Sequence, residues 1–288
     1  MEEYISDNSL YIRSKNNSMI NRKMIGRVLG MLLFIELGMF LLCAGVSAGY
    51  GESDYKYFLY TCIINAVVGG LLLLYGRGAE NKMSRRDGYC VVTLSWVFFT
   101  FFGMLPFYFS GSIDTITNAF FETMSGFTTT GATILDDIES LSHGMLFWRS
   151  LTQWIGGLGI VFFTIAILPI FTTGGVQLFS AESTGVTHDR THPKINVMAK
   201  WLWTIYLVLT VSETVLLMFG GMSLFDAICQ SFATTATGGY STKQNSISYW
   251  NSPYIEYVVA IFMIVSSINF SLFLMCLKGK VGRFFKDE

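Results

Sequence analysis

Charged residues are scarce in this sequence. They make up 14% of the 288 residues, against 52% hydrophobic and 16% aromatic residues, and the mean hydropathy is +0.49. A soluble domain carries about 25% charged residues, so the composition excludes an ordinary soluble protein. Proline is scarce too, with four residues, whereas the 28 glycines fit membrane helices, in which glycine is common at helix contacts. We therefore expect an all-α integral membrane protein.

The sequence also lacks a long basic run, metal-ligand spacings and catalytic pairs. A net charge of -1 without a long basic run gives no indication of nucleic-acid binding. No nucleophile with a neighbouring base is evident, which predicts that the protein is not an enzyme. The cysteines match no metal motif, and we expect them to be reduced and buried because each lies in or beside an apolar segment. They are Cys43, Cys62, Cys90, Cys229 and Cys276.

Long apolar runs fill most of the chain, and each is long enough to cross a hydrocarbon core of about 30 Å. The six predicted spans are residues 25–48, 57–75, 89–109, 145–171, 199–219 and 254–277, with the third broken near Pro106. All but three of the 19 Lys and Arg residues fall in segments that six spans place on one side of the membrane. The positive-inside rule makes that side the cytosol, so both termini are expected there.

Two short runs of small residues and hydroxyls interrupt this pattern. Residues 127–133 follow a short amphipathic segment over 113–127, and residues 235–241 follow a second one over 223–235. Non-helical backbone at membrane depth is tolerated only where protein buries it or where it lines a water-filled path. A Thr/Gly run preceded by a half-helix is what a ring of carbonyls for a dehydrated cation requires. We therefore expect two re-entrant half-helices with filter loops, the alternative being ordinary interfacial helices.

The two runs belong to an internal repeat. A shift of 108 residues places Thr129 on Thr237 and Gly131 on Gly239. Each unit is predicted to contain a spanning helix, a half-helix, a loop and a second spanning helix, with the same polarity in both. The predicted divisions are 1–87 (cytosolic arm and two extra spans), 88–175 (first repeat), 176–195 (cytosolic linker) and 196–288 (second repeat and basic tail).

Two carboxylates fall at or near membrane depth, where acidic side chains are functional candidates. Glu122 lies close behind the first polar run, where it is predicted to brace the loop by hydrogen bonds or to raise the local cation concentration. Glu213, in the fifth span, is expected to be mostly structural.

Capping and packing signals accompany these segments. Ser223 followed by Asp226 reads as a capping box for the second half-helix, and Asp114 is the candidate cap of the first. The glycine-rich run over residues 156–159 lies inside a spanning helix and follows no soluble strand. It is therefore predicted to serve close helix packing rather than nucleotide binding.

Several motifs resemble those of the Trk/Ktr/HKT potassium transporters, above all the TrkH branch. The motifs at the entry to the first repeat are Arg86-Asp87-Gly88-Tyr89, Leu94-Ser95-Trp96 and Gly103-Met104-Leu105-Pro106-Phe107. Residues 125–133 are similar to that branch's first filter, residues 154–159 to the helix that follows it, and residues 236–241 to its second filter. The resemblance covers nearly the whole chain.

The resemblance implies K+ uptake across the bacterial inner membrane, with K+ as the transported ion. It implies K+ coordination by the backbone carbonyls of Thr129, Thr130, Thr237 and Gly238, with Glu122 as support. The filter residues that it implies are Thr128, Thr129, Thr130, Gly131, Ala236, Thr237, Gly238 and Gly239. It further implies a homodimer regulated by a cytosolic nucleotide-binding ring of the TrkA type.

The sequence departs from that family in having two such repeats where the family has four. A ring of carbonyls needs all its quadrants, because a half ring leaves the ion partly unsolvated. We therefore expect the N-terminal half of such a protein, from a truncated gene, a split gene or a fragment, whose partner carries two further repeats. Two alternatives stay open, namely a non-conducting membrane scaffold and a pore formed by two copies of this chain.

Overall fold

The computed structural model describes residues 20–79, 84–159 and 195–268, and this part of the chain contains helices and turns but no strand. The elements are α2 (Arg22–Gly49), α3 (Tyr55–Tyr75), α4 (Arg85–Gly103), α5 (Leu105–Ser110), α6 (Ile116–Phe127), α7 (His143–Gly157), α10 (Ile195–Phe219), α11 (Leu224–Thr235), the 3-10 helix η2 (Ser246–Trp250) and α12 (Pro253–Ser267). The predicted all-α class is confirmed for these residues.

Four stretches of the described residues are long and apolar enough to cross a membrane: Arg22–Gly49, Tyr55–Tyr75, Arg86–Phe109 and Trp201–Phe219. They coincide with the first, second, third and fifth predicted spans. The fourth and sixth predicted spans begin as α7 and α12, and their remaining residues lie outside the described part of the chain. The count of six spans therefore stays a prediction.

The third span breaks where the sequence predicted a break. Helix α4 ends at Gly103 and α5 begins at Leu105, so that Pro106 lies in the first turn of the new helix. Proline is tolerated there because the first amide groups of a helix have no intrahelical acceptor.

The two half-helices α6 and α11 have 12 residues each. At a rise of about 1.5 Å per residue such a helix is about 18 Å long, which is too short to span a bilayer. Ser223 caps α11 as predicted, since its side chain accepts a hydrogen bond from the amide of Asp226 at 3.1 Å.

The predicted cap of the first half-helix was wrong by one residue. Thr115, not Asp114, is the N-cap of α6, and its hydroxyl accepts a hydrogen bond from the amide of Asn118 at 3.2 Å. A cap must sit directly before the first helical residue for its side chain to reach the free amides of the first turn. Asp114 lies one residue too early for that.

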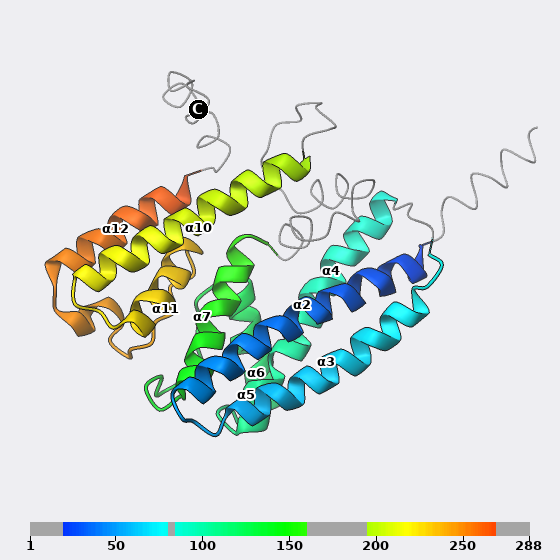
Figure 1. The fold of residues 1–288 in the computed structure, drawn as a ribbon, viewed down its shortest axis with the longest axis horizontal. Coiled ribbons are helices and arrows are strands. Elements are labelled where there is room, and N and C mark those ends of the chain that lie inside the picture. The colour runs from blue at the N-terminus through cyan, green and yellow to red at the C-terminus, as the bar shows by residue number, and fades with distance from the viewer. Residues whose placement is uncertain (1–19, 80–83, 160–194, 269–288) are drawn as a thin grey trace, which may run out of the picture.

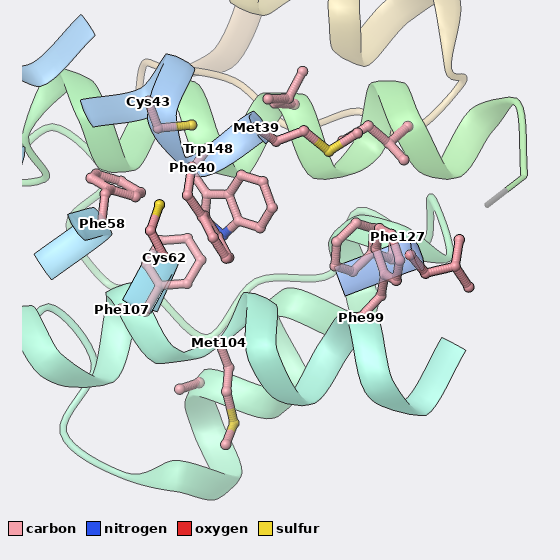
Figure 2. Packing of buried hydrophobic residues seen from close by; sticks show 14 of the residues in the cluster. Met39, Phe40, Cys43, Phe58, Cys62, Phe99, Met104, Phe107, Phe127 and Trp148 are labelled. Atoms are coloured by element: carbon pink, nitrogen blue, oxygen red, sulfur yellow. The ribbon is translucent and has the colours of Figure 1, made fainter. Parts of the chain in front are cut away.

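The larger hydrophobic core packs around the end of the first half-helix (Figure 2). The ring of Trp148, from α7, lies 4.6 Å from that of Phe40 and 6.0 Å from that of Phe127, centroid to centroid. Phe127, the last residue of α6, also meets Phe99 edge-on at 5.6 Å. The indole nitrogen of Trp148 donates to the carbonyl of Gly103 at 2.8 Å. Aromatic packing and this hydrogen bond thus fix the point at which α6 ends.

A second, smaller core lies among α10, α11 and α12. Figure 1 shows these three helices on one side of the molecule and α2 to α6 on the other, with α7 in between. Helix α7 contacts both α6 and α11. Residues on α7 can therefore reach both half-helices.

The turn between α2 and α3 is tied to the start of α7. The carboxylate of Glu52 accepts hydrogen bonds from the amides of His143 at 2.9 Å and Gly144 at 3.3 Å, and Nδ1 of His143 lies 2.7 Å away. The ring of Tyr50 stacks on that of His143, with 3.9 Å between centroids. Burial raises the pKa of Glu52, but the hydrogen bonds from His143 and Gly144 outweigh burial and leave the pKa below its ordinary 4.5.

This arrangement predicts a pH-dependent contribution to stability. A carboxyl whose pKa is lowered by folding stabilises the folded state above its unfolded pKa, and the contribution disappears as the pH falls through the folded pKa. At neutral pH, Glu52→Gln should cost about 0.3–1 kcal/mol, because the neutral amide loses the attraction between the carboxylate charge and the N-terminus of α7. The difference in thermal midpoint between the wild type and Glu52→Gln, measured in detergent, should shrink below pH 4.5.

Asp54→Asn is the matched control, because Asp54 lies in the same turn and its side chain makes no capping hydrogen bond. A difference between the wild type and Glu52→Gln that stays constant with pH would contradict the assignment.

Candidate functional site

Both half-helices end in the same hydrogen-bonded turn. After α6, the amide of Thr129 donates to the carbonyl of Gly126 and that of Thr130 to the carbonyl of Ser125, both at 3.0 Å. These two bonds, 5→2 and 6→1, define a Schellman motif, which normally places glycine in the left-handed position.

The turn after α11 repeats this pattern. The amide of Thr237 donates to the carbonyl of Thr234 and that of Gly238 to the carbonyl of Ala233, both at 2.9 Å. Each donor and each acceptor is displaced from its counterpart by the predicted 108 residues. The two turns are therefore built alike in their backbone as well as in their sequence.

The backbone after each half-helix is left-handed at two positions. Thr129 and Thr237 have φ of 52° and 54°, and Gly131 and Gly239 have φ of 74° and 83°. A β-branched residue at positive φ is an outlier. Such strain persists only where the surrounding structure enforces it, and it gathers at functional sites. Its occurrence at the same position in both repeats points to a shared requirement.

Two loops follow the half-helices: the first loop is residues 128–131 and the second loop is residues 236–239. Their backbone hydrogen bonds form at amides rather than at carbonyls. All four amides of the first loop, and those of residues 236–238 in the second, donate to carbonyls of the preceding half-helix. No carbonyl of either loop accepts a hydrogen bond from the described residues. The loops therefore offer oxygen atoms without competing donors, an arrangement that can coordinate a dehydrated cation.

The two loops lie against each other. A Cβ atom added to Gly131 would overlap the carbonyl oxygen of Gly238. The sequence placed these residues in separate repeats, and the fold brings them into contact. The two predicted filter loops therefore adjoin at Gly131 and Gly238.

Glu122 holds the chain that leaves the first loop. Its side chain is 1% exposed, and its carboxylate accepts from the hydroxyl of Thr133 at 2.9 Å, the amide of Ile134 at 3.0 Å and Nε of Arg149 at 2.8 Å. These are the contacts of a brace. Because Arg149 compensates its charge, the contacts do not favour the alternative that Glu122 attracts cations.

Arg149 and Tyr240 link the two repeats. Nη1 of Arg149 donates to the carbonyl of Ser241 at 3.0 Å, and its guanidinium lies 3.6 Å from the centroid of the Tyr240 ring. The hydroxyl of Tyr240 donates to the carbonyl of Glu122 at 2.9 Å and lies 3.2 Å from that of Ala132. Sequence reasoning missed these links, although a basic residue inside an apolar run signals the partner that a buried carboxylate needs.

The glycines at the end of α7 pack on both half-helix ends. A Cβ on Gly156 would overlap the carbonyl oxygen of Phe127, and a Cβ on Gly157 would lie 2.8 Å from the Cα of Ala236. These glycines therefore allow α7 to pack closely against the ends of both half-helices. Residues 160–171 of the same predicted span lie outside the described residues.

Glu213 lies behind the second half-helix and is 0% exposed. Its carboxylate accepts from the hydroxyl of Thr235 at 3.4 Å, so it contacts the end of α11 rather than the second loop. Among the described residues, no group of three or more His, Cys, Asp or Glu could hold a metal ion. The oxygen atoms present in the two loops are those of backbone carbonyls and threonine hydroxyls.

Breaking the pair of Glu122 and Arg149 should destabilise the protein strongly. Removing one partner of a buried ion pair leaves the other charge unpaired, at a cost of about 3–5 kcal/mol. Arg149→Gln and Glu122→Gln should each lower the thermal midpoint in detergent, and the double variant should lose less than the sum. Additive losses would show that the two charges do not depend on each other.

Comparisons with known proteins show the family to which the chain belongs. A family profile described as "TrkH: Cation transport protein" matches residues 55–287. The Trk system potassium uptake protein TrkH of Escherichia coli strain K12 is 42% identical over 258 residues, which are 89% of this chain and 53% of that protein. TrkH of Halomonas elongata is 36% identical over 92% of this chain and 56% of its own length.

A solved structure is similar as well. The crystal structure of the potassium transporter TrkH from Vibrio parahaemolyticus superposes with a TM-score of 0.76 at 34% identity, covering 91% of this chain and 53% of that one. The chain thus spans about half the length of the relatives it matches. Since the family profile covers most of the sequence, the chain belongs to the TrkH family of cation transport proteins.

Proposed function

We propose that this chain takes part in K+ uptake across the bacterial inner membrane and supplies two of the four quadrants of a K+ selectivity filter. The observation that carries the proposal is the pair of adjoining loops whose amides are bonded and whose carbonyls accept no hydrogen bond from the described residues. The relatives named as potassium uptake proteins favour K+ as the ion.

The electrostatics of the half-helices favour a cation at the loops. Each half-helix ends at its loop, so its last carbonyls and the negative end of its dipole lie there. Carbonyls of Thr129, Thr130, Thr237 and Gly238 are the proposed ligands, and the hydroxyls of the threonines add oxygen atoms on the cavity side. Glu122 acts on this site indirectly, through the brace described above.

The remaining quadrants require a further segment with two more loops. This follows from the chemistry of dehydration, because an ion that leaves water needs oxygen atoms on all sides. We further propose that both termini are cytosolic and that the complete protein is a homodimer on a cytosolic nucleotide-binding ring. Thiol labelling of a cysteine at position 243, but not at position 77, by an impermeant reagent in intact cells would support the orientation.

Gly131→Ser should lower the selectivity for K+ over Na+ in the protein completed by its C-terminal half. Serine at φ of 74° is strained, and its Cβ would displace the carbonyl of Gly238 at the contact between the loops. Gly239→Ser shares the strain at φ of 83° but meets no atom within 4 Å, so its effect should be smaller. The measurement is Rb+ uptake in competition with Na+ at equal membrane levels.

Gly111→Ser is the matched control, because Gly111 has φ of 72° and open space around it at the end of α5. It should leave selectivity unchanged. Unchanged selectivity in Gly131→Ser and Gly239→Ser alike would show that these loops are not the filter.

The two open alternatives make different predictions for rescue. The 288-residue chain alone should enter the membrane without restoring growth of a K+-uptake-deficient strain at low K+. Co-expression with a segment that carries two further filter loops should restore it. Robust rescue by the chain alone would favour a pore of two copies, and no rescue in either case would favour a non-conducting scaffold.

A further inference from the structure

A buried amide side chain on α7 lies where the two loops meet. Gln153 is 0% exposed, and its Oε1 accepts a hydrogen bond from the backbone amide of Tyr240 at 3.0 Å. Because that amide is a donor, it must face the oxygen of the glutamine, which settles which end of the side chain is the nitrogen. Nε2 is buried and finds no acceptor among the described residues.

The side-chain nitrogen Nε2 of Gln153 lies close to both loops. A Cβ added to Gly238 would lie 2.6 Å from Nε2, and one added to Gly131 would lie 3.8 Å from it. A buried donor without an acceptor destabilises the folded state, because it has lost its hydrogen bonds to water. Such a group in a native structure therefore calls for an explanation, for example a water or an ion-dependent arrangement that satisfies it.

The two loops differ at the residue that Gln153 touches. Thr130 and Gly238 are equivalent under the shift of 108 residues, yet Thr130 is exposed and Gly238 is buried. Gly238 is not among the glycines with positive φ, so its backbone conformation does not require glycine. The side-chain amide of Gln153 occupies the space that a Cβ would need. Gly238 and Gln153 are therefore complementary in shape.

We propose that Gln153 is a positioning residue of the filter, an inference that rests on the proposed function. Its Oε1 fixes the second loop through the amide of Tyr240. Its Nε2 donates through one water to the backbone at the contact of Gly131 and Gly238. Selectivity for K+ depends on the spacing and field strength of the carbonyls, and a donor at this contact sets both for two neighbouring quadrants.

Two substitutions separate the roles of the two ends of the amide, in the protein completed by its C-terminal half. Gln153→Leu removes the acceptor and the donor, so it should lower the K+/Na+ uptake ratio about 2- to 10-fold, the range for one ordinary hydrogen bond, and speed hydrogen exchange at the amide of Tyr240. Gln153→Glu keeps an oxygen for that amide but loses the donor. It should change the uptake ratio while the amide of Tyr240 stays protected.

Gln230→Leu is the matched control. Gln230 is 5% exposed, and the hydrogen bond of its side-chain amide runs to the hydroxyl of Thr234, one turn along the same helix. This variant should change neither the uptake ratio nor the exchange at Tyr240. Gln153→Glu, which preserves the side-chain shape, decides the question if Gln153→Leu does not reach the membrane.

The outcomes separate this inference from the proposed function. Unchanged K+/Na+ uptake ratios in both Gln153 variants would overturn the inference, even if hydrogen exchange at the amide of Tyr240 became faster. Gln153 would then hold the second loop without affecting selectivity. If Gly131→Ser still lowers selectivity in that case, the loops remain the filter. A protein without K+ uptake would refute the proposed function and this inference together, and hydrogen exchange would then report only on how the second loop is held.

Discussion

The structure depends on how the backbone hydrogen bonds are divided at the end of each half-helix. In the two turns, the amides fold back onto the half-helix and the carbonyls of the loops are left over. Backbone groups that are removed from water need a partner, so at the membrane depth predicted for these loops the carbonyls would require water or a cation beside them. The left-handed threonines, Thr129 and Thr237, are the strained residues through which the chain achieves this division.

Contacts between the two repeats hold the segments that flank these turns. Arg149, on the helix after the first loop, bonds both to Glu122 behind that loop and to the carbonyl of Ser241 after the second. Tyr240 reaches back from the second loop to the carbonyl of Glu122. The ion pair is buried, so its value lies less in net stability than in fixing one arrangement of the two loops, a role that buried polar groups take in some proteins.

Much of this arrangement could be predicted from the sequence, because it is local. The half-helices, the break near Pro106 and the shift of 108 residues follow from short-range patterns of apolar, glycine and hydroxyl residues. The cross-links could not be predicted, since the hydrogen bonds of Arg149 to Ser241 and of Gln153 to Tyr240 join residues 92 and 87 positions apart. A single sequence carries periodicity and capping signals but no record of which side chains meet across a fold.

The two repeat units have similar backbone turns but different side chains, and the difference has a physical cause. Helix α7 contacts both half-helices, and the side chain of Gln153 on α7 lies near Gly131 of the first loop and Gly238 of the second. At the position where the first loop carries Thr130, which is exposed, the second carries Gly238, which is packed against Gln153. The first loop therefore has an exposed threonine side chain at this position. In the second loop, the side-chain amide of Gln153 occupies the equivalent space. Substitutions at equivalent positions of the two loops should therefore not have equal effects.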